Sequence, residues 1–128
     1  MTNEHIDLAI INRAKEDNVK LVQLQFTDIN GNIKAVTIPV ERFPESIEKG
    51  IWFDGSSIEG FTRICESDMY LTPYTSTYAL LPWETEEATA RLFCDVYMPD
   101  GSPFEGDPRY ILKRAIKNAR AMNFEYNV

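Results

Sequence analysis

Residues 53–60, FDGSSIEG, hold the residue types that could do chemistry in this chain. The stretch contains two glycines, two serines and an acidic residue near each end. Three kinds of site use such residues within a short space: a phosphate-binding loop, a serine nucleophile, and a loop that presents a carboxylate. Each kind has further requirements at neighbouring positions, so the sequence can be tested against all three.

The glycines have the spacing of a phosphate-binding loop, but the residues after them do not fit. Gly55 and Gly60 would be followed by a lysine, which reaches the phosphates, and by a hydroxyl residue that binds Mg²⁺. Here Phe61 and Thr62 follow. Because the cation is missing, the sequence argues against a phosphate-binding loop.

A serine nucleophile on a sharp turn has the pattern G-x-S-x-G. Ser57 follows Gly55 at the right distance, but Glu59 stands where the second glycine would permit the turn. The only histidine, His5, lies near the N-terminus, in a segment that we expect to be helical. Nothing in the pattern therefore supplies an imidazole to activate the hydroxyl.

The carboxylate interpretation remains. Asp54 begins the loop, and Glu59, Glu66 and Asp68 follow within fifteen residues. A carboxylate held in a loop can attract a cation or accept a proton without help from a histidine. An aspartate can equally cap a turn, because its side chain accepts hydrogen bonds from backbone N–H groups two residues on. Residue types alone favour the cap and leave the chemical role open.

Periodicity predicts the elements that precede the loop. Apolar residues recur at helical spacing over residues 5–17, and they alternate with polar residues over 21–29, as in a half-buried strand. The Asn-Gly pair at 30–31 predicts a tight turn into a return strand over 33–38. Residues 41–50 predict a short helical turn that ends at Gly50.

The start of that hairpin, DINGNI, also resembles the beginning of a calcium-binding loop. Such a loop needs glycine at its sixth position and glutamate at its twelfth. Ile33 and Pro39 stand there instead. The hairpin is therefore the better interpretation.

After the loop, short strands are expected at residues 68–73, 76–83 and 88–97, and residues 98–106 read as a linker rich in Gly and Pro. Asp107 and Pro108 then predict the start of a helix, as N-cap and first helical residue. Residues 124–128 are expected to begin a strand. Trp52 and Trp83 are expected to be packing aromatics.

These elements predict an α+β domain over residues 1–103, followed at 104–128 by the start of a second, truncated domain. The apolar face of the last helix would have little to pack on within the first domain. Its members are Ile111, Leu112, Ala115, Ile116, Ala119 and Met122. The basic residues on its other side, Arg109, Lys113, Lys117 and Arg120, are interpreted as a solvated face.

Composition bounds the function. The 128 residues carry a net charge of −7, which argues against a nucleic-acid partner, and 44% are hydrophobic, enough for a core. Cys65 and Cys94 are far apart and are expected to be reduced thiols. No apolar run reaches the roughly 20 residues of a membrane span, and no secretory signal is visible, so a cytoplasmic location is expected.

Several segments resemble, in order, the N-terminal part of glutamine synthetase type I, the bacterial and archaeal form. They are VQLQFTDINGNIKAVTIP, FDGSSIEGFTRICESDMYL, LLPW and DVYMPDGSPFEGDPRYILKRAI, and together they span almost the whole chain. FDGSSI with ESDM and GDPR at these separations is a specific pattern. The resemblance implies a β-grasp domain, a mixed sheet with packed helices, followed by the first helix of a catalytic domain.

The resemblance also implies a reaction, the ATP-dependent ligation of ammonium to glutamate through γ-glutamyl phosphate. The family's enzymes are dodecamers in which the N-terminal domain of one subunit completes the active site of its neighbour. ATP and Mg²⁺ or Mn²⁺ would bind to residues beyond Val128, so no cofactor or metal is expected within these residues, and the chain alone is expected to be inactive. The alternative is a stand-alone β-grasp module that binds a partner without catalysis.

By the same resemblance, Asp54 would attract ammonium and help to deprotonate it, and Ser57 would support the geometry of that loop. Arg63 would sense glutamine during feedback inhibition, with a surface ion pair as the competing interpretation. Arg91 resembles an arginine that some archaeal members use to bind 2-oxoglutarate. A surface charge at a strand edge is the simpler interpretation of Arg91.

Overall fold

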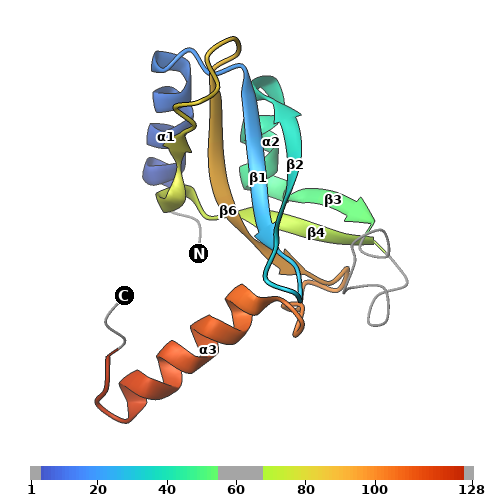
Figure 1. The fold of residues 1–128 in the computed structure, drawn as a ribbon, viewed down its shortest axis with the longest axis vertical. Coiled ribbons are helices and arrows are strands. Elements are labelled where there is room, and N and C mark those ends of the chain that lie inside the picture. The colour runs from blue at the N-terminus through green and yellow to red at the C-terminus, as the bar shows by residue number, and fades with distance from the viewer. Residues whose placement is uncertain (1–3, 55–67, 126–128) are drawn as a thin grey trace.

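The computed structural model describes residues 4–54 and 68–125 (Figure 1). Ser57 and Arg63 therefore lie outside the described residues, as do the other residues of 55–67. The helices and strands are α1 (Glu4–Glu16), β1 (Leu21–Thr27), β2 (Ile33–Pro39), η1 (Val40–Arg42), α2 (Phe43–Lys49), β3 (Ile51–Asp54), β4 (Asp68–Pro73), η3 (Thr75–Thr77), β5 (Ala79–Leu80), β6 (Thr89–Tyr97) and α3 (Pro108–Ala121).

The strands form one mixed sheet in the order β2-β1-β6-β4-β3, with β5 also paired to β6. β1 and β6 are parallel, and every other pairing is antiparallel. β6 lies at the centre, with β1 along one edge and β5 and β4 along the other. The centre of the sheet is thus built from an early strand and a late strand of the chain.

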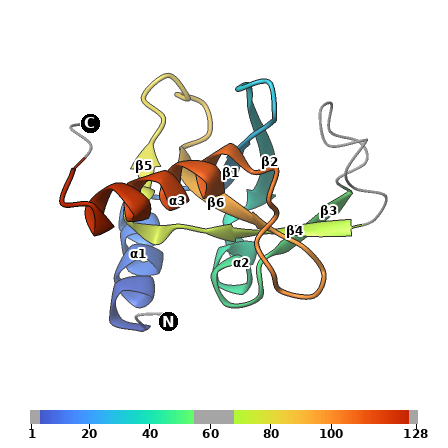
Figure 2. The ribbon, with the colours of Figure 1, turned by 90° about the horizontal axis from the view of Figure 1, so that it is seen from below.

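One face of the sheet carries the hydrophobic core. Alternate residues of β1 and β6 are buried there, and α1 and α2 cover them, with Ala14, Phe43 and Ile47 in the same cluster. Figure 2 shows α1 and α2 on one side of the sheet and α3 on the other. We call the face opposite α1 and α2 the open face; its residues include Trp52, Asp54, Tyr70, Arg91, Phe93, Asp95 and Tyr97.

The predictions before the loop are confirmed. The first helix, the hairpin and the short helix form where periodicity placed them, and Gly50 ends α2 with a φ of 74°. Asp28 belongs to the hairpin turn, where its Oδ1 accepts a hydrogen bond from the Asn32 N–H at 2.8 Å. The prediction did not include β3, whose four residues are too few to show a period.

The predicted strand over 76–83 is wrong. The chain forms the 3₁₀ helix η3 there, then only two residues of strand in β5, and residues 82–83 lie in a turn. The tryptophans lie at the surface, with exposed fractions of 54% for Trp52 and 70% for Trp83. Trp52 is nevertheless a packing aromatic, since its ring centroid is 5.1 Å from that of Tyr70. Residues 124–125 form no strand, and 126–128 lie outside the described residues.

The segment expected to be a linker folds back on β6. Pro103 forms a bridge with Tyr97, and the Phe104 N–H donates to the Val96 carbonyl at 2.9 Å. The Phe104 side chain is 1% exposed and belongs to the core. The path of the chain into α3 is therefore fixed against the end of β6.

α3 begins as predicted, with Asp107 as N-cap and Pro108 in the first turn. None of its residues, all of which the structure describes, is buried. Ile111, Leu112 and Met122 are 55%, 53% and 67% exposed. In Figure 1 the helix runs away from the sheet after its first turns. Among the described helices, none is both long and apolar enough to cross a membrane.

Candidate functional site

Asp54 is the last residue of β3 and pairs with Asp68, the first residue of β4. The register that starts at Ile51 and Leu71 brings these two acids opposite each other, so the loop of residues 55–67 leaves and re-enters the sheet at adjacent positions. Both side chains are exposed. Residues that face each other in an antiparallel pair have Cβ atoms about 4.5–5.5 Å apart, so two carboxylates there repel each other.

This repulsion defines what the end of the β3–β4 pair can do chemically. A cation near Asp54 and Asp68 would be attracted by both carboxylates. The arrangement thus suits a small cation. The sequence placed both acids in one group, and the strand register shows that they lie opposite each other.

A row of aromatic rings packs across β3, the strand that carries Asp54, and its neighbours β4 and β6. Trp52, Tyr70 and Tyr97 occupy paired positions on β3, β4 and β6, on the same face as Asp54. The ring centroids are 5.1 Å apart for Trp52 and Tyr70 and 5.4 Å apart for Tyr70 and Tyr97. Burial, and then the charge of Asp95, raises the pKa of Tyr97, so its hydroxyl stays protonated at neutral pH.

Arg91 lies elsewhere on the open face, and it is not at a strand edge. β6 is a central strand, and Arg91 pairs with Gln23 on one side and Ala79 on the other. Its Nη1 donates to the Thr77 carbonyl, and its guanidinium carbon is 4.3 Å from the centroid of the Phe93 ring. The side chain therefore holds η3 to the sheet, and its strand contacts are separate from those of Asp54.

The other expected site residues, Ser57 and Arg63, lie outside the described residues. Over residues 4–54 and 68–125, no group of three or more His, Cys, Asp or Glu side chains could hold a metal ion.

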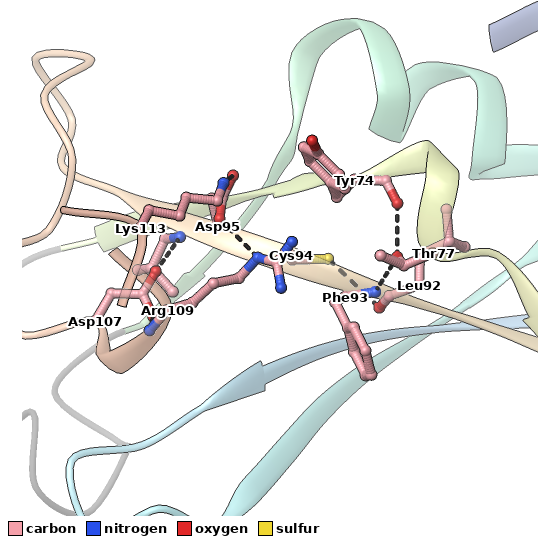
Figure 3. A network of polar contacts seen from close by, with 10 residues as sticks. Tyr74, Thr77, Leu92, Phe93, Cys94, Asp95, Asp107, Arg109 and Lys113 are labelled. Atoms are coloured by element: carbon pink, nitrogen blue, oxygen red, sulfur yellow. Dashed lines mark hydrogen bonds and ion pairs between the residues drawn. The ribbon is translucent and has the colours of Figure 1, made fainter. Parts of the chain in front are cut away.

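A charged cluster that the sequence did not predict joins α3 to the open face (Figure 3). The Asp95 carboxylate accepts hydrogen bonds from the Arg109 Nε at 3.1 Å and the Lys113 Nζ at 2.7 Å. Arg109 and Lys113 are thus paired, and the prediction of a solvated basic face is wrong for these two. A signal was present, because residues four apart share a helix face and Asp95 alternates with the buried Cys94 and Val96.

The fold indicates the class of protein, and comparison with known proteins then gives the family. The first and last strands, β1 and β6, pair in parallel within a mixed sheet that has helices packed on it. This is the arrangement of a β-grasp domain. The sequence model of the family described as "Glutamine synthetase, beta-Grasp domain" matches residues 18–99. The chain belongs to the glutamine synthetase family.

Curated relatives agree with this assignment. The chain is 57% identical over 111 residues to glutamine synthetase from Thermotoga maritima, covering 86% of this chain and 25% of the relative. It is 53% identical over 120 residues to glutamine synthetase from Methanosarcina mazei, covering 93% of this chain and 27% of the relative. The chain thus spans about a quarter of the length of these relatives.

Solved structures share the fold. A cryo-EM structure of Plasmodium falciparum glutamine synthetase matches with a TM-score of 0.78 at 23% identity, covering 95% of this chain and 23% of that chain. A complex of GmaS with ADP matches with a TM-score of 0.75, also at 23% identity, covering 88% of this chain and 26% of that chain.

Proposed function

We propose that the chain is the N-terminal part of a glutamate–ammonia ligase, which joins ammonium to glutamate at the expense of ATP. In this reaction the γ-carboxylate of glutamate takes the terminal phosphoryl group of ATP, and ADP leaves. Ammonium gives a proton to a base, and the resulting ammonia attacks the γ-carbonyl carbon. The C–N bond forms as phosphate leaves.

Asp54 is the proposed base and ammonium ligand. The observation that carries this proposal is its position at the end of β3, exposed and opposite Asp68, in a chain of this family. Two facing carboxylates attract a monovalent cation, and a carboxylate within reach of that cation can accept a proton from it. Ser57 supports the geometry of the same loop in the proposal, and Arg63 senses glutamine. A role for Arg91 in binding 2-oxoglutarate is the least supported, because its guanidinium already contacts Thr77 and Phe93.

The domain division belongs to the same proposal. Residues 1–103 are the β-grasp domain, and 104–128, of which Phe104 still packs in the core of that domain, begin a catalytic domain that holds the sites for ATP, Mg²⁺ or Mn²⁺, and glutamate. The exposed apolar residues of α3 support this division, since a second domain would cover them. The 128 residues alone are then inactive.

The proposed assembly is a cytoplasmic homo-oligomer, a dodecamer, in which the open face meets the active site of a neighbouring subunit. Trp52, which is 54% exposed next to Tyr70, supports an interface, because Trp and Tyr are enriched at the centres of interfaces. Asp54 lies two residues further along the same strand and face.

The test is Asp54→Asn in the full-length enzyme. We expect a higher KM for ammonium and a fall in kcat of about 10²-fold or more, because both the cation ligand and the proton acceptor are lost. Glu16→Gln is the matched control, since Glu16 is an exposed acid at the end of α1, which covers the opposite face of the sheet. Glutamine formation is measured at varied ammonium concentration. Wild-type kinetics for Asp54→Asn would remove Asp54 from the mechanism.

A further inference from the structure

α3 meets the sheet through the charged cluster of Asp95, Arg109 and Lys113. Asp95 stands on the open face of β6, and its side chain is 17% exposed. Each carboxylate oxygen has its own cation: Oδ1 is 3.1 Å from the Arg109 Nε, and Oδ2 is 2.7 Å from the Lys113 Nζ. A carboxylate with both oxygens engaged by residues four apart on a helix fixes the rotation of that helix as well as its position.

Aromatic rings hold the same two cations from another side (Figure 3). The guanidinium carbon of Arg109 is 5.1 Å from the centroid of the Tyr74 ring and 5.9 Å from that of Phe93. The Lys113 Nζ is 4.9 Å from the centroid of the Tyr74 ring. These distances are within the range of cation–π attraction, so the cluster restrains both side chains against the sheet.

The start of α3 is tied to β6 by a second contact. Asp107 is fully buried, and its Oδ1 accepts a hydrogen bond from the Arg109 N–H at 3.0 Å, which caps the helix. Its Oδ2 accepts one from the Val96 N–H at 3.1 Å. The helix cap and the strand thus share the Asp107 carboxylate, which binds the strand at Val96, the residue after Asp95.

Apolar burial does not explain the direction of α3. None of its fourteen residues is buried, and Ile111 and Leu112, in its first two turns, are more than half exposed. The direction of the helix from the sheet is therefore set by polar contacts. Asp107 fixes where the helix begins, and Asp95 is the common partner of the two side chains further along it.

We propose that Asp95 is a positioning residue, which sets the angle between the β-grasp sheet and the domain that α3 begins. This inference rests on the proposed function. In the full-length enzyme the angle decides where the sheet, and with it Asp54, stands relative to the catalytic domains. Loss of the Asp95 charge frees α3 to swing, so Asp54 is held less well at its site, while residues that bind ATP keep their places.

The kinetic test is Asp95→Asn in the full-length enzyme, a change that keeps the size of the side chain. We expect the KM for ammonium to rise about tenfold with the KM for ATP unchanged, because a small misplacement of a positioned group is costly and only Asp54 is displaced. Glu45→Gln is the control, since it removes the charge from an exposed ion pair with Arg42, at 3.8 Å, on α2. An unchanged ammonium KM, or an equal rise in both KM values, would overturn the proposal.

A second measurement reads the angle itself in the 128-residue chain. Residual dipolar couplings of amides in α3 and the sheet should fit one alignment tensor in the wild type, and the couplings of α3 alone should shrink in Asp95→Asn. Lys113→Met, which removes one of the two cations, should show a smaller change in the same direction and serves if Asp95→Asn does not fold. Unchanged couplings in α3 would refute the positioning role. If the full-length wild type makes no glutamine, the proposed function fails, while the couplings still test the contact.

Discussion

Thr77 shows how one side chain replaces the backbone contacts of a strand. Where β4 gives way to η3, the Thr77 Oγ1 accepts a hydrogen bond from the Phe93 N–H at 2.8 Å and donates one to the Tyr74 carbonyl at 2.6 Å. Its carbonyl accepts the bond from Arg91. The break between β4 and β5 therefore leaves the edge of β6 satisfied, which accounts for the interrupted strand.

Thr77→Val should lower the free energy of unfolding by about 1–2 kcal/mol, because the Phe93 N–H loses its acceptor in a part-buried position while the shape is kept. Urea denaturation followed by circular dichroism measures the change. Thr77→Ser keeps the hydroxyl and is the control, with a smaller loss expected. A loss in Thr77→Ser with no loss in Thr77→Val would mean that the methyl group, and not the hydroxyl, stabilises the break.

At the level of elements, the junction between β6 and α3 carries two aspartates whose pKa values move in opposite directions. Burial raises the pKa of Asp107, and the hydrogen bonds from Val96 and Arg109 oppose that rise only in part. Hydrogen bonds from the Ser102 hydroxyl and N–H lower the pKa of Asp100, in the turn before α3. Folding therefore favours the protonated form of Asp107 and the ionised form of Asp100.

The sign of each pH dependence follows from these directions. The stabilisation that proton binding at Asp107 adds to the free energy of unfolding is fully present below its unfolded pKa and is lost as the pH rises through its folded pKa. Wild type should therefore gain stability relative to Asp107→Asn as the pH falls from neutral. The stabilisation that the ionised Asp100 adds to the free energy of unfolding is present above its unfolded pKa and is lost as the pH falls through its folded pKa. Wild type should therefore lose stability relative to Asp100→Asn in acid. Urea denaturation at several pH values measures both differences, and the same slope in both would contradict the assignment.

At the scale of the whole molecule, Cys94 reports on the opening of the sheet, because it lies buried on the central strand β6. It is 1% exposed on β6, and burial, followed by the charge of Asp95, raises the pKa of its thiol. Because the thiolate is the reactive form, the native protein should protect this group strongly.

In a Cys65→Ser chain, where Cys94 is the only thiol, we expect labelling by a thiol reagent to require global unfolding. The labelling rate should rise with urea in step with the unfolded fraction seen by circular dichroism. Fully denatured protein, which should react at once, is the control. Rapid labelling without denaturant would show that β6 opens locally.

Much of the fold could be predicted from local signals. The first helix, the hairpin over residues 21–39 and the start of α3 at Asp107 and Pro108 depend on residues within a few positions of one another. Asp54 also stood out before the structure, because the family resemblance indicates it, whereas residue types alone favour a turn cap.

The remaining features depend on pairing between distant segments, which periodicity does not report. The parallel pairing of β1 with β6, the register that brings Asp54 opposite Asp68, and the break at η3 are of this kind. The ion pairs of Asp95 also needed the structure, because the spacing of Arg109 and Lys113 shows that they share a helix face but not that this face meets Asp95.

The central place of β6 has a consequence for how the chain folds during synthesis. β1 and β2 leave the ribosome long before β6, yet β1 lacks its second neighbour in the sheet until β6 arrives. Pairing across so many residues is slow, because a long loop must close before any contact forms. In the meantime the early hairpin exposes an unpaired edge, which is open to wrong partners. The nascent chain is thus most vulnerable to aggregation before residues 89–97 emerge, and a chaperone that shields the edge of β1 would act in that interval.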